Sequence, residues 1–148
     1  MKRFFLLRPL TLLLATLAVL ATATPARAAE RPHASSGTAQ FTATGFVGTG
    51  RALHLGTYTE EGTIQLFPTS DPTVFDASAT AIYTAANGDE LHATFTGQLN
   101  FATGVITATV TYVGGTGRFA GATGSATLSG QLLQDGTLAV SVIGTIDY

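Results

Sequence analysis

The sequence contains no cysteine, and only 11% of its 148 residues are charged. Without cysteine, no disulfide can stabilise the fold and no lipid can be attached at a thiol. Residues 29–148 also lack lysine, and three arginines against nine carboxylates give them a formal charge of −6. Nucleic acids and anionic membranes are bound through several Lys or Arg contacts, so neither is expected as a partner.

Strong helix formers such as Lys, Glu, Gln and Met are scarce after residue 28, and no apolar stripe with helical spacing occurs there. Threonine is present 22 times in this segment and glycine 17 times. This balance favours β-strands joined by tight turns.

The first 28 residues are typical of a secretory signal peptide. Lys2, Arg3 and Arg8 form a positive start, an apolar run covers residues 10–23, and residues 26–28 read Ala-Arg-Ala, a small-x-small cleavage site. The apolar run is too short for a membrane-spanning helix, which needs roughly 20 residues. We therefore expect a secreted or periplasmic protein with no membrane attachment after cleavage.

The remaining 120 residues, 29–148, suffice for one domain with its own core. Residues 29–37 are polar and predict a flexible leader, and residues 38–148 predict the folded domain. Short alternating runs separated by turn signals indicate an all-β sandwich or barrel. Eight strands are predicted, over residues 38–47, 51–58, 63–67, 74–85, 90–101, 106–113, 124–133 and 137–147.

Turn geometry predicts how the later strands pair, because a slip of one residue would turn the apolar side chains outward. A three-residue loop ending in a left-handed glycine keeps the apolar faces together at two turns, and a four-residue loop does so at a third. The loops are residues 86–88, pairing Tyr83 with Leu91; 134–136, pairing Leu132 with Leu138; and 102–105, pairing Phe101 with Ile106.

Eight strands with one apolar face and no covering helix predict an antiparallel up-and-down barrel of the calycin type, rather than a sandwich. The predicted interior includes Phe41, Val47, Leu53, Leu66 and Val110 and has no acidic group. Many other inward positions are Ala or Gly. A barrel of this size either fills with side chains or holds one small ligand, and the sequence leaves both open.

The most distinctive segment is residues 114–124, GGTGRFAGATG, where five glycines indicate a shaped loop with positive φ angles. It lacks the Gly-Lys-Ser/Thr ending of a phosphate-binding loop. Together with residues 54–56 (HLG) and the turn at 85–91 (AANGDEL), it resembles bacterial secreted members of the allene oxide cyclase and dirigent barrel superfamily. The resemblance implies an eight-stranded barrel with an apolar interior, assembled as dimers or trimers in plant relatives.

The resemblance also implies activities. Plant cyclases of this type close an unstable epoxide into a cyclopentenone, and dirigent proteins hold radicals for stereoselective coupling. We match no catalytic carboxylate or cysteine of the cyclases to a position here, so no catalytic residue is assigned. No metal or other cofactor is predicted, since His33, His54 and His92 lack neighbouring ligands at metal-binding spacing.

The candidate ligand-binding residues are interior aromatics and groups near the barrel ends. Buried tyrosines usually bond backbone or water, but inside an apolar pocket they also orient a ligand carbonyl or phenol. An apolar residue of the glycine loop is expected to plug one end. These candidates are Tyr83, Tyr112, Phe95, Arg51, His54 and Phe119.

Three functions fit these observations. The first is a secreted barrel that binds a small apolar molecule without catalysis. The second is a cyclase or isomerase that acts on a small hydrophobic substrate mainly by restricting its orientation. The third is a structural envelope protein whose threonine-rich exterior packs against further copies and whose interior is filled.

Overall fold

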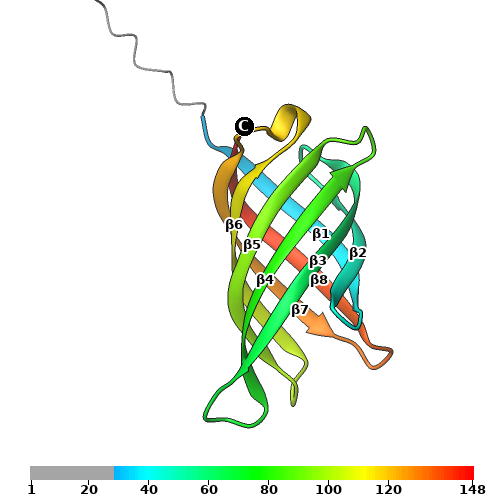
Figure 1. Ribbon diagram of the computed structural model, residues 1–148, viewed down its shortest axis with the longest axis vertical. Coiled ribbons are helices and arrows are strands. Elements are labelled where there is room, and N and C mark those ends of the chain that lie inside the picture. The colour runs from blue at the N-terminus through cyan, green and yellow to red at the C-terminus, as the bar shows by residue number, and fades with distance from the viewer. Residues whose placement is uncertain (1–28) are drawn as a thin grey trace, which may run out of the picture.

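Successive antiparallel hairpins account for residues 29–148, the part of the chain that the computed structural model describes (Figure 1). The signal peptide predicted for residues 1–28 lies outside the described residues. The elements are β1 (Arg31–Phe41), β2 (Gly45–Ala52), β3 (Gly56–Pro68), β4 (Val74–Ala85), β5 (Glu90–Asn100), β6 (Val105–Gly115), the single turn η1 (Gly117–Phe119), β7 (Thr123–Leu132) and β8 (Thr137–Asp147).

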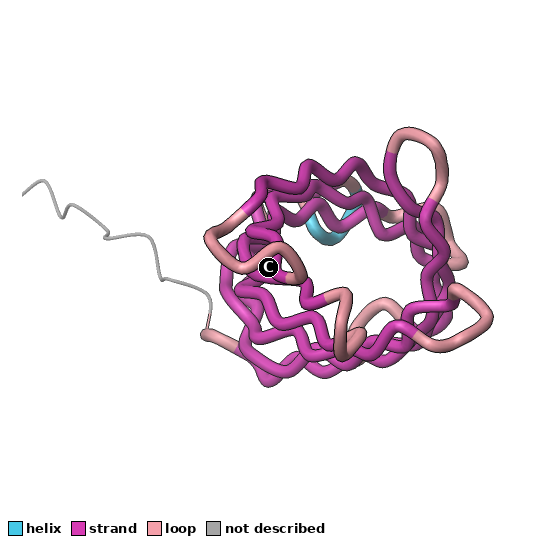
Figure 2. The backbone as a smooth tube through the Cα atoms, turned by 90° about the horizontal axis from the view of Figure 1, so that it is seen from below, coloured by secondary structure: helices cyan, strands magenta, loops and turns pink. Residues whose placement is uncertain are grey.

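Each strand pairs with its sequence neighbours, and β8 pairs with β1, so the sheet closes into an up-and-down barrel of eight strands. Viewed along its axis, the backbone forms an oval ring with η1 at the far end (Figure 2). Closure removes the free sheet edges that an open β-sheet would expose. The predicted antiparallel barrel is therefore confirmed.

The pairing predicted for two of the turns is confirmed. Tyr83 lies opposite Leu91, and Leu132 lies opposite Leu138. The glycines that close these loops, Gly88 and Gly136, have φ angles of 87° and 82°. A glycine adopts this left-handed conformation without the strain that a side chain would cause.

The turn between β5 and β6 lies one residue earlier than predicted, so the predicted pairing is wrong by two residues. Leu99, not Phe101, lies opposite Ile106. The Asn100 side chain explains the shift, because its Oδ1 accepts hydrogen bonds from the backbone N–H groups of residues 102 and 103 and so fixes the turn at residues 101–104. The apolar face is preserved, because the error is an even number of residues.

The flexible leader predicted for residues 29–37 is wrong, because β1 begins at Arg31 and pairs with both β2 and β8. Its inward positions carry polar or small residues, among them His33 and Gly37, so the segment lacks the alternation expected of a strand. Pro32 fits near the start of the strand, where loss of one N–H is tolerated.

The first two predicted strands are also misplaced, and the third, residues 63–67, covers only part of β3. Residues 38–47 span the turn at 42–44, and residues 51–58 span the turn at 53–55. Consequently Val47 and Leu53, predicted to lie inside, are about half exposed. The cause is three glycines of β2, which are typical of turns but here lie within the strand.

The glycine loop closes one end of the barrel, as predicted. Four of its five glycines have positive φ, and Phe119 is fully buried beneath the loop, in contact with Tyr148. Arg118 lies on the rim and forms an ion pair with Asp89, at 3.3 Å between Nε and Oδ2. We call this the plugged end; it includes the turns at residues 53–55, 86–89 and 116–122. Among residues 29–148, no helix has the length and apolarity needed to cross a bilayer.

Candidate functional site

The opposite end of the barrel contains a cavity. This open end carries the turns at residues 42–44, 69–73, 101–104 and 133–136. The cavity has a volume of about 60 Å³ and lies within a wider opening of about 640 Å³ that is continuous with the solvent. That space corresponds to roughly four to six water molecules, or to one small organic molecule of similar bulk. The barrel is thus packed near the plug and hollow near the mouth.

Apolar and aromatic side chains form most of the cavity wall. Aliphatic residues come from β1, β3, β4, β6, β7 and β8, and several are alanines that leave space open. Such a wall favours a ligand that is largely hydrocarbon. The aromatic residues are Phe41, Phe46, Tyr58, Tyr83 and Phe95.

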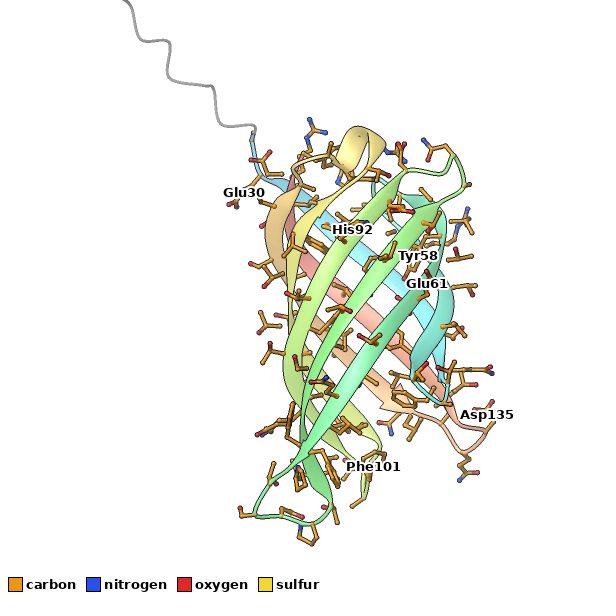
Figure 3. All side chains as sticks on the ribbon, viewed as in Figure 1. Glu30, Tyr58, Glu61, His92, Phe101 and Asp135 are labelled. Atoms are coloured by element: carbon orange, nitrogen blue, oxygen red, sulfur yellow. The ribbon has the colours of Figure 1, made fainter. Side chains whose placement is uncertain are left out.

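The mouth of the cavity is itself apolar. Phe41 and Ile64 line both the cavity and a shallow groove on the rim, and Leu66 and Phe101 continue that groove. Figure 3 shows Phe101 and Asp135 at this end, opposite Glu30. Exposed apolar groups around an opening provide a route by which an apolar molecule enters without crossing a charged ring.

Three polar side chains border the inner part of the cavity: Tyr58 and Glu60 from β3 and Tyr83 from β4. The rings of Tyr58 and Tyr83 meet edge to face, with 5.2 Å between their centroids. Glycines of β2 make room for this group. Gly50 lies opposite Tyr58 and Gly48 opposite Glu60, and a Cβ on either glycine would collide with the facing side chain.

Glu60 is the unexpected member, since the sequence predicted no acidic group inside the barrel. Its side chain points inward and is only 8% exposed. Burial raises the pKa of Glu60 to about 7, because the charged form loses its hydration. Near neutral pH the carboxyl group therefore exchanges readily between its two protonation states.

The interior tyrosines remain protonated over the physiological pH range. Burial, followed by the nearby Glu60 charge, raises the pKa of Tyr58 to about 12. The same two causes raise the pKa of Tyr83 well above 10, and burial also raises that of Tyr112. Tyr58 and Tyr83 therefore keep their hydroxyl protons and are not anions.

His33 occupies the packed half of the barrel, although the sequence placed it in a flexible leader. Its ring contacts Tyr112 edge to face, at 5.2 Å between centroids, and its Nδ1 atom is buried without a hydrogen-bond partner in the described structure. Burial, and secondarily the neighbouring His54, lowers the pKa of His33 to about 4. The imidazole is therefore neutral at physiological pH.

The structure separates the six predicted ligand-binding residues into three groups. Tyr83 and Phe95 line the cavity. Tyr112 and Phe119 are buried in the packed half, away from the cavity wall. The other two residues are Arg51 and His54.

Arg51 and His54 do not reach the cavity. Arg51 points to the outer surface of β2, because alternation places it on the opposite face from Gly50. His54 lies in the turn at residues 53–55 with a φ of 76°, and its Nε2 donates a hydrogen bond to the Pro32 carbonyl at 2.9 Å. Both had been expected beside a mouth, but this end is the plugged one.

Sequence reasoning missed Tyr58 and Glu60. A glutamate in a threonine-rich strand is usually exposed. The available signal was their pairing in the β2–β3 hairpin, where each large inward residue faces a glycine. Because the predicted bounds of β2 and β3 were wrong, that pairing could not be read from the sequence.

No group of three or more His, Asp or Glu side chains within residues 29–148 is arranged to hold a metal ion. Comparison with known proteins yields no match to a family model, to a curated protein or to a solved structure.

Proposed function

We propose that this barrel binds a small, mostly apolar molecule in the cavity at its open end. The observation that carries the proposal is the combination of an apolar cavity with three polar groups at its inner part, Tyr58, Glu60 and Tyr83. An apolar wall supplies affinity, and a few converging polar groups orient the ligand, which is the usual composition of small-molecule sites. The structural alternative expected a filled interior, and the cavity gives it no support.

The proposed site lies in a protein that we expect to act outside the cytoplasm. The features that support export are the positive start, the apolar run and the cleavage site within residues 1–28. Mass spectrometry of the protein recovered from a bacterial culture tests this. A mature chain beginning at Ala29 supports export, and an uncleaved cytoplasmic chain contradicts it.

A binding experiment with a matched pair of variants tests the proposed function. Cyclohexanol is a neutral probe whose size suits the cavity, and NMR of the ¹⁵N-labelled protein detects binding even at millimolar affinity. We expect shifts of the Gly48 and Gly50 amides, which lie beside Glu60 and Tyr58. Ala79→Leu fills the cavity and should abolish the shifts, whereas Thr49→Ala, on the outer face, should leave them intact.

Any of three results would contradict binding in the cavity. If neither cyclohexanol nor its amine counterpart cyclohexylamine produces saturable shifts, or if Ala79→Leu binds either of them as the parent protein does, the cavity is not a ligand site. Shifts confined to the outer surface of β2 and β3 would also contradict the proposal, because they would place the probe outside the barrel.

A second candidate function, an isomerase or cyclase, is favoured by the Glu60 carboxyl group. A carboxyl with a pKa about 7 is suited to take up and return protons at neutral pH. A tyrosine hydroxyl beside it, from Tyr58 or Tyr83, can stabilise a developing enolate by hydrogen bonding. The arrangement supports proton transfer at a carbon next to a carbonyl group.

Conversion of 3-cyclohexenone to 2-cyclohexenone tests this second function. Glu60 would remove a proton from C2 and return it to C4, so the reaction needs no further reagent. We expect the protein to accelerate the isomerisation and Glu60→Gln to remove the acceleration. If the variant and the parent protein give the same rate as buffer, the barrel has no activity of this kind.

A further inference from the structure

The cavity of the open end holds one ionisable carboxyl group and no cationic partner. Among the described residues that line it, Glu60 is the one acidic or basic side chain. The remaining side chains are apolar, apart from two tyrosines. A buried carboxylate without a partner charge is unfavourable. A ligand that supplies the missing positive charge therefore binds with higher affinity, and a ligand that brings a negative charge is repelled.

The groups that surround Glu60 do not neutralise it from outside. Tyr58 and Tyr83 face it within the barrel and are uncharged. The charged residues of the adjoining strands, Arg51 on β2 and Asp76 on β4, are exposed on the outer surface. His33 lies in the packed half and is neutral. Nothing on the neighbouring elements therefore competes with a ligand for this carboxyl group.

Aromatic rings provide the second part of a cation site. Five of the cavity-lining residues are aromatic, and they come from β1 to β5. The faces of such rings attract an organic cation, especially where water is excluded. A carboxylate combined with several aromatic rings thus recognises an ammonium group carried on a hydrocarbon body.

We propose that the cavity selects a small apolar amine, whose ammonium group pairs with the Glu60 carboxylate while its hydrocarbon part fills the aromatic-lined space. This inference rests on the binding function proposed above and specifies its ligand class. The acidic character of residues 29–148, with a formal charge of −6, favours the approach of a cation. Apolar carboxylates such as fatty acids are disfavoured for the same reasons.

Three probes of one shape test the inference: cyclohexylamine, which is protonated at neutral pH, cyclohexanol and cyclohexanecarboxylate. NMR titration at pH 8 should give an affinity for the amine at least about tenfold higher than for the alcohol, and no binding of the carboxylate. At pH 5, where Glu60 is protonated, the affinity for the amine should fall at least about tenfold. The affinity for the alcohol should be the same at both pH values.

Two neighbouring variants provide matched controls. Glu60→Gln keeps the shape of the side chain and removes its charge, so the affinity for the amine should fall to that of the alcohol. Glu61→Gln makes the same change one residue later, where the side chain is exposed on the outer face, and should bind like the parent protein. If Glu60→Gln does not fold, the ¹³C-detected pKa of Glu60 in the parent protein decides, since the amine should lower it by at least about one unit.

The outcomes separate this inference from the function on which it rests. If the alcohol binds as tightly as the amine, or more tightly, the cavity binds apolar molecules but does not select a cation, and the inference is overturned alone. Tightest binding of the carboxylate has the same consequence. If none of the three probes binds, both proposals are overturned together.

Discussion

The Tyr58 hydroxyl lies directly against Gly50 on the neighbouring strand, where a side chain on residue 50 would occupy the same space. We therefore expect Gly50→Ala to displace Tyr58 and to lower the free energy of unfolding by about 1–3 kcal/mol. The outward neighbour Thr49 provides the control, and Thr49→Ala should change stability by less than about 0.5 kcal/mol. Urea denaturation measures both, and equal effects would contradict the contact.

The cavity predicts a difference between two alanines on the inner face of β4. Ala79 lines the cavity, whereas Ala81 is 3% exposed within the packed core. Leucine at position 79 extends into free space, so we expect stability to be unchanged or raised. Leucine at position 81 must displace its neighbours and should cost about 1–3 kcal/mol. Thermal unfolding compares the two, and a larger loss at position 79 would mean that the cavity is absent.

Removal of the plug should destabilise the barrel strongly. Phe119 is completely buried, and we expect Phe119→Ala to cost about 3–5 kcal/mol because it leaves a void under the glycine loop. Phe67, which is half exposed, is the comparison residue, and Phe67→Ala should cost less than about 1 kcal/mol. Denaturant unfolding at pH 7 measures the difference. A loss below about 1 kcal/mol at position 119 would contradict the role of the plug.

Two interior groups give opposing dependences of stability on pH. His33 has its pKa lowered from 6.5 to about 4, so between these values the unfolded chain binds a proton that the fold does not, and stability falls as the pH falls. Glu60 has its pKa raised from 4.5 to about 7, so the fold retains a proton that the unfolded chain has lost, and stability rises as the pH falls. The two effects nearly cancel between pH 4.5 and 6.5.

This cancellation can be tested by removing one partner. We expect the parent protein to change in unfolding free energy by less than about 1 kcal/mol across that window, whereas Glu60→Gln should lose about 2 kcal/mol on acidification from pH 6.5 to 4.5. Glu61→Gln should follow the parent protein. A flat profile for Glu60→Gln would show that His33 is not held neutral by the fold.

The sequence predicted the second half of the barrel well, for a definable physical reason. Strands β4 to β8 alternate clearly between apolar and polar residues, so Phe95 and Leu99 point inward in the only register that keeps their neighbours buried. Glycines in the turns then determine the loop lengths. In β1 to β3 the inward positions include four glycines, which contribute nothing to a hydrophobic pattern, and the strand boundaries were misplaced.

The candidate site was predictable only in part for the same reason. Tyr83 and Phe95 lie on well-predicted strands and do line the cavity. Glu60 lies on β3, and its burial depends on Gly48 across the hairpin, a relationship that appears only once the register of the two strands is known. Burial of a charged group is a property of a pair of strands rather than of one segment.

The plugged end also carries both limits of the described chain. Glu30 lies at this end, opposite the cavity mouth (Figure 3), and so does Tyr148, whose ring contacts Phe119 of the glycine loop (Figure 1). A fusion partner, a dye or a solid support joined at residue 148 would leave the entrance facing free solution. The protein thus offers a natural orientation for immobilised capture of the proposed ligand.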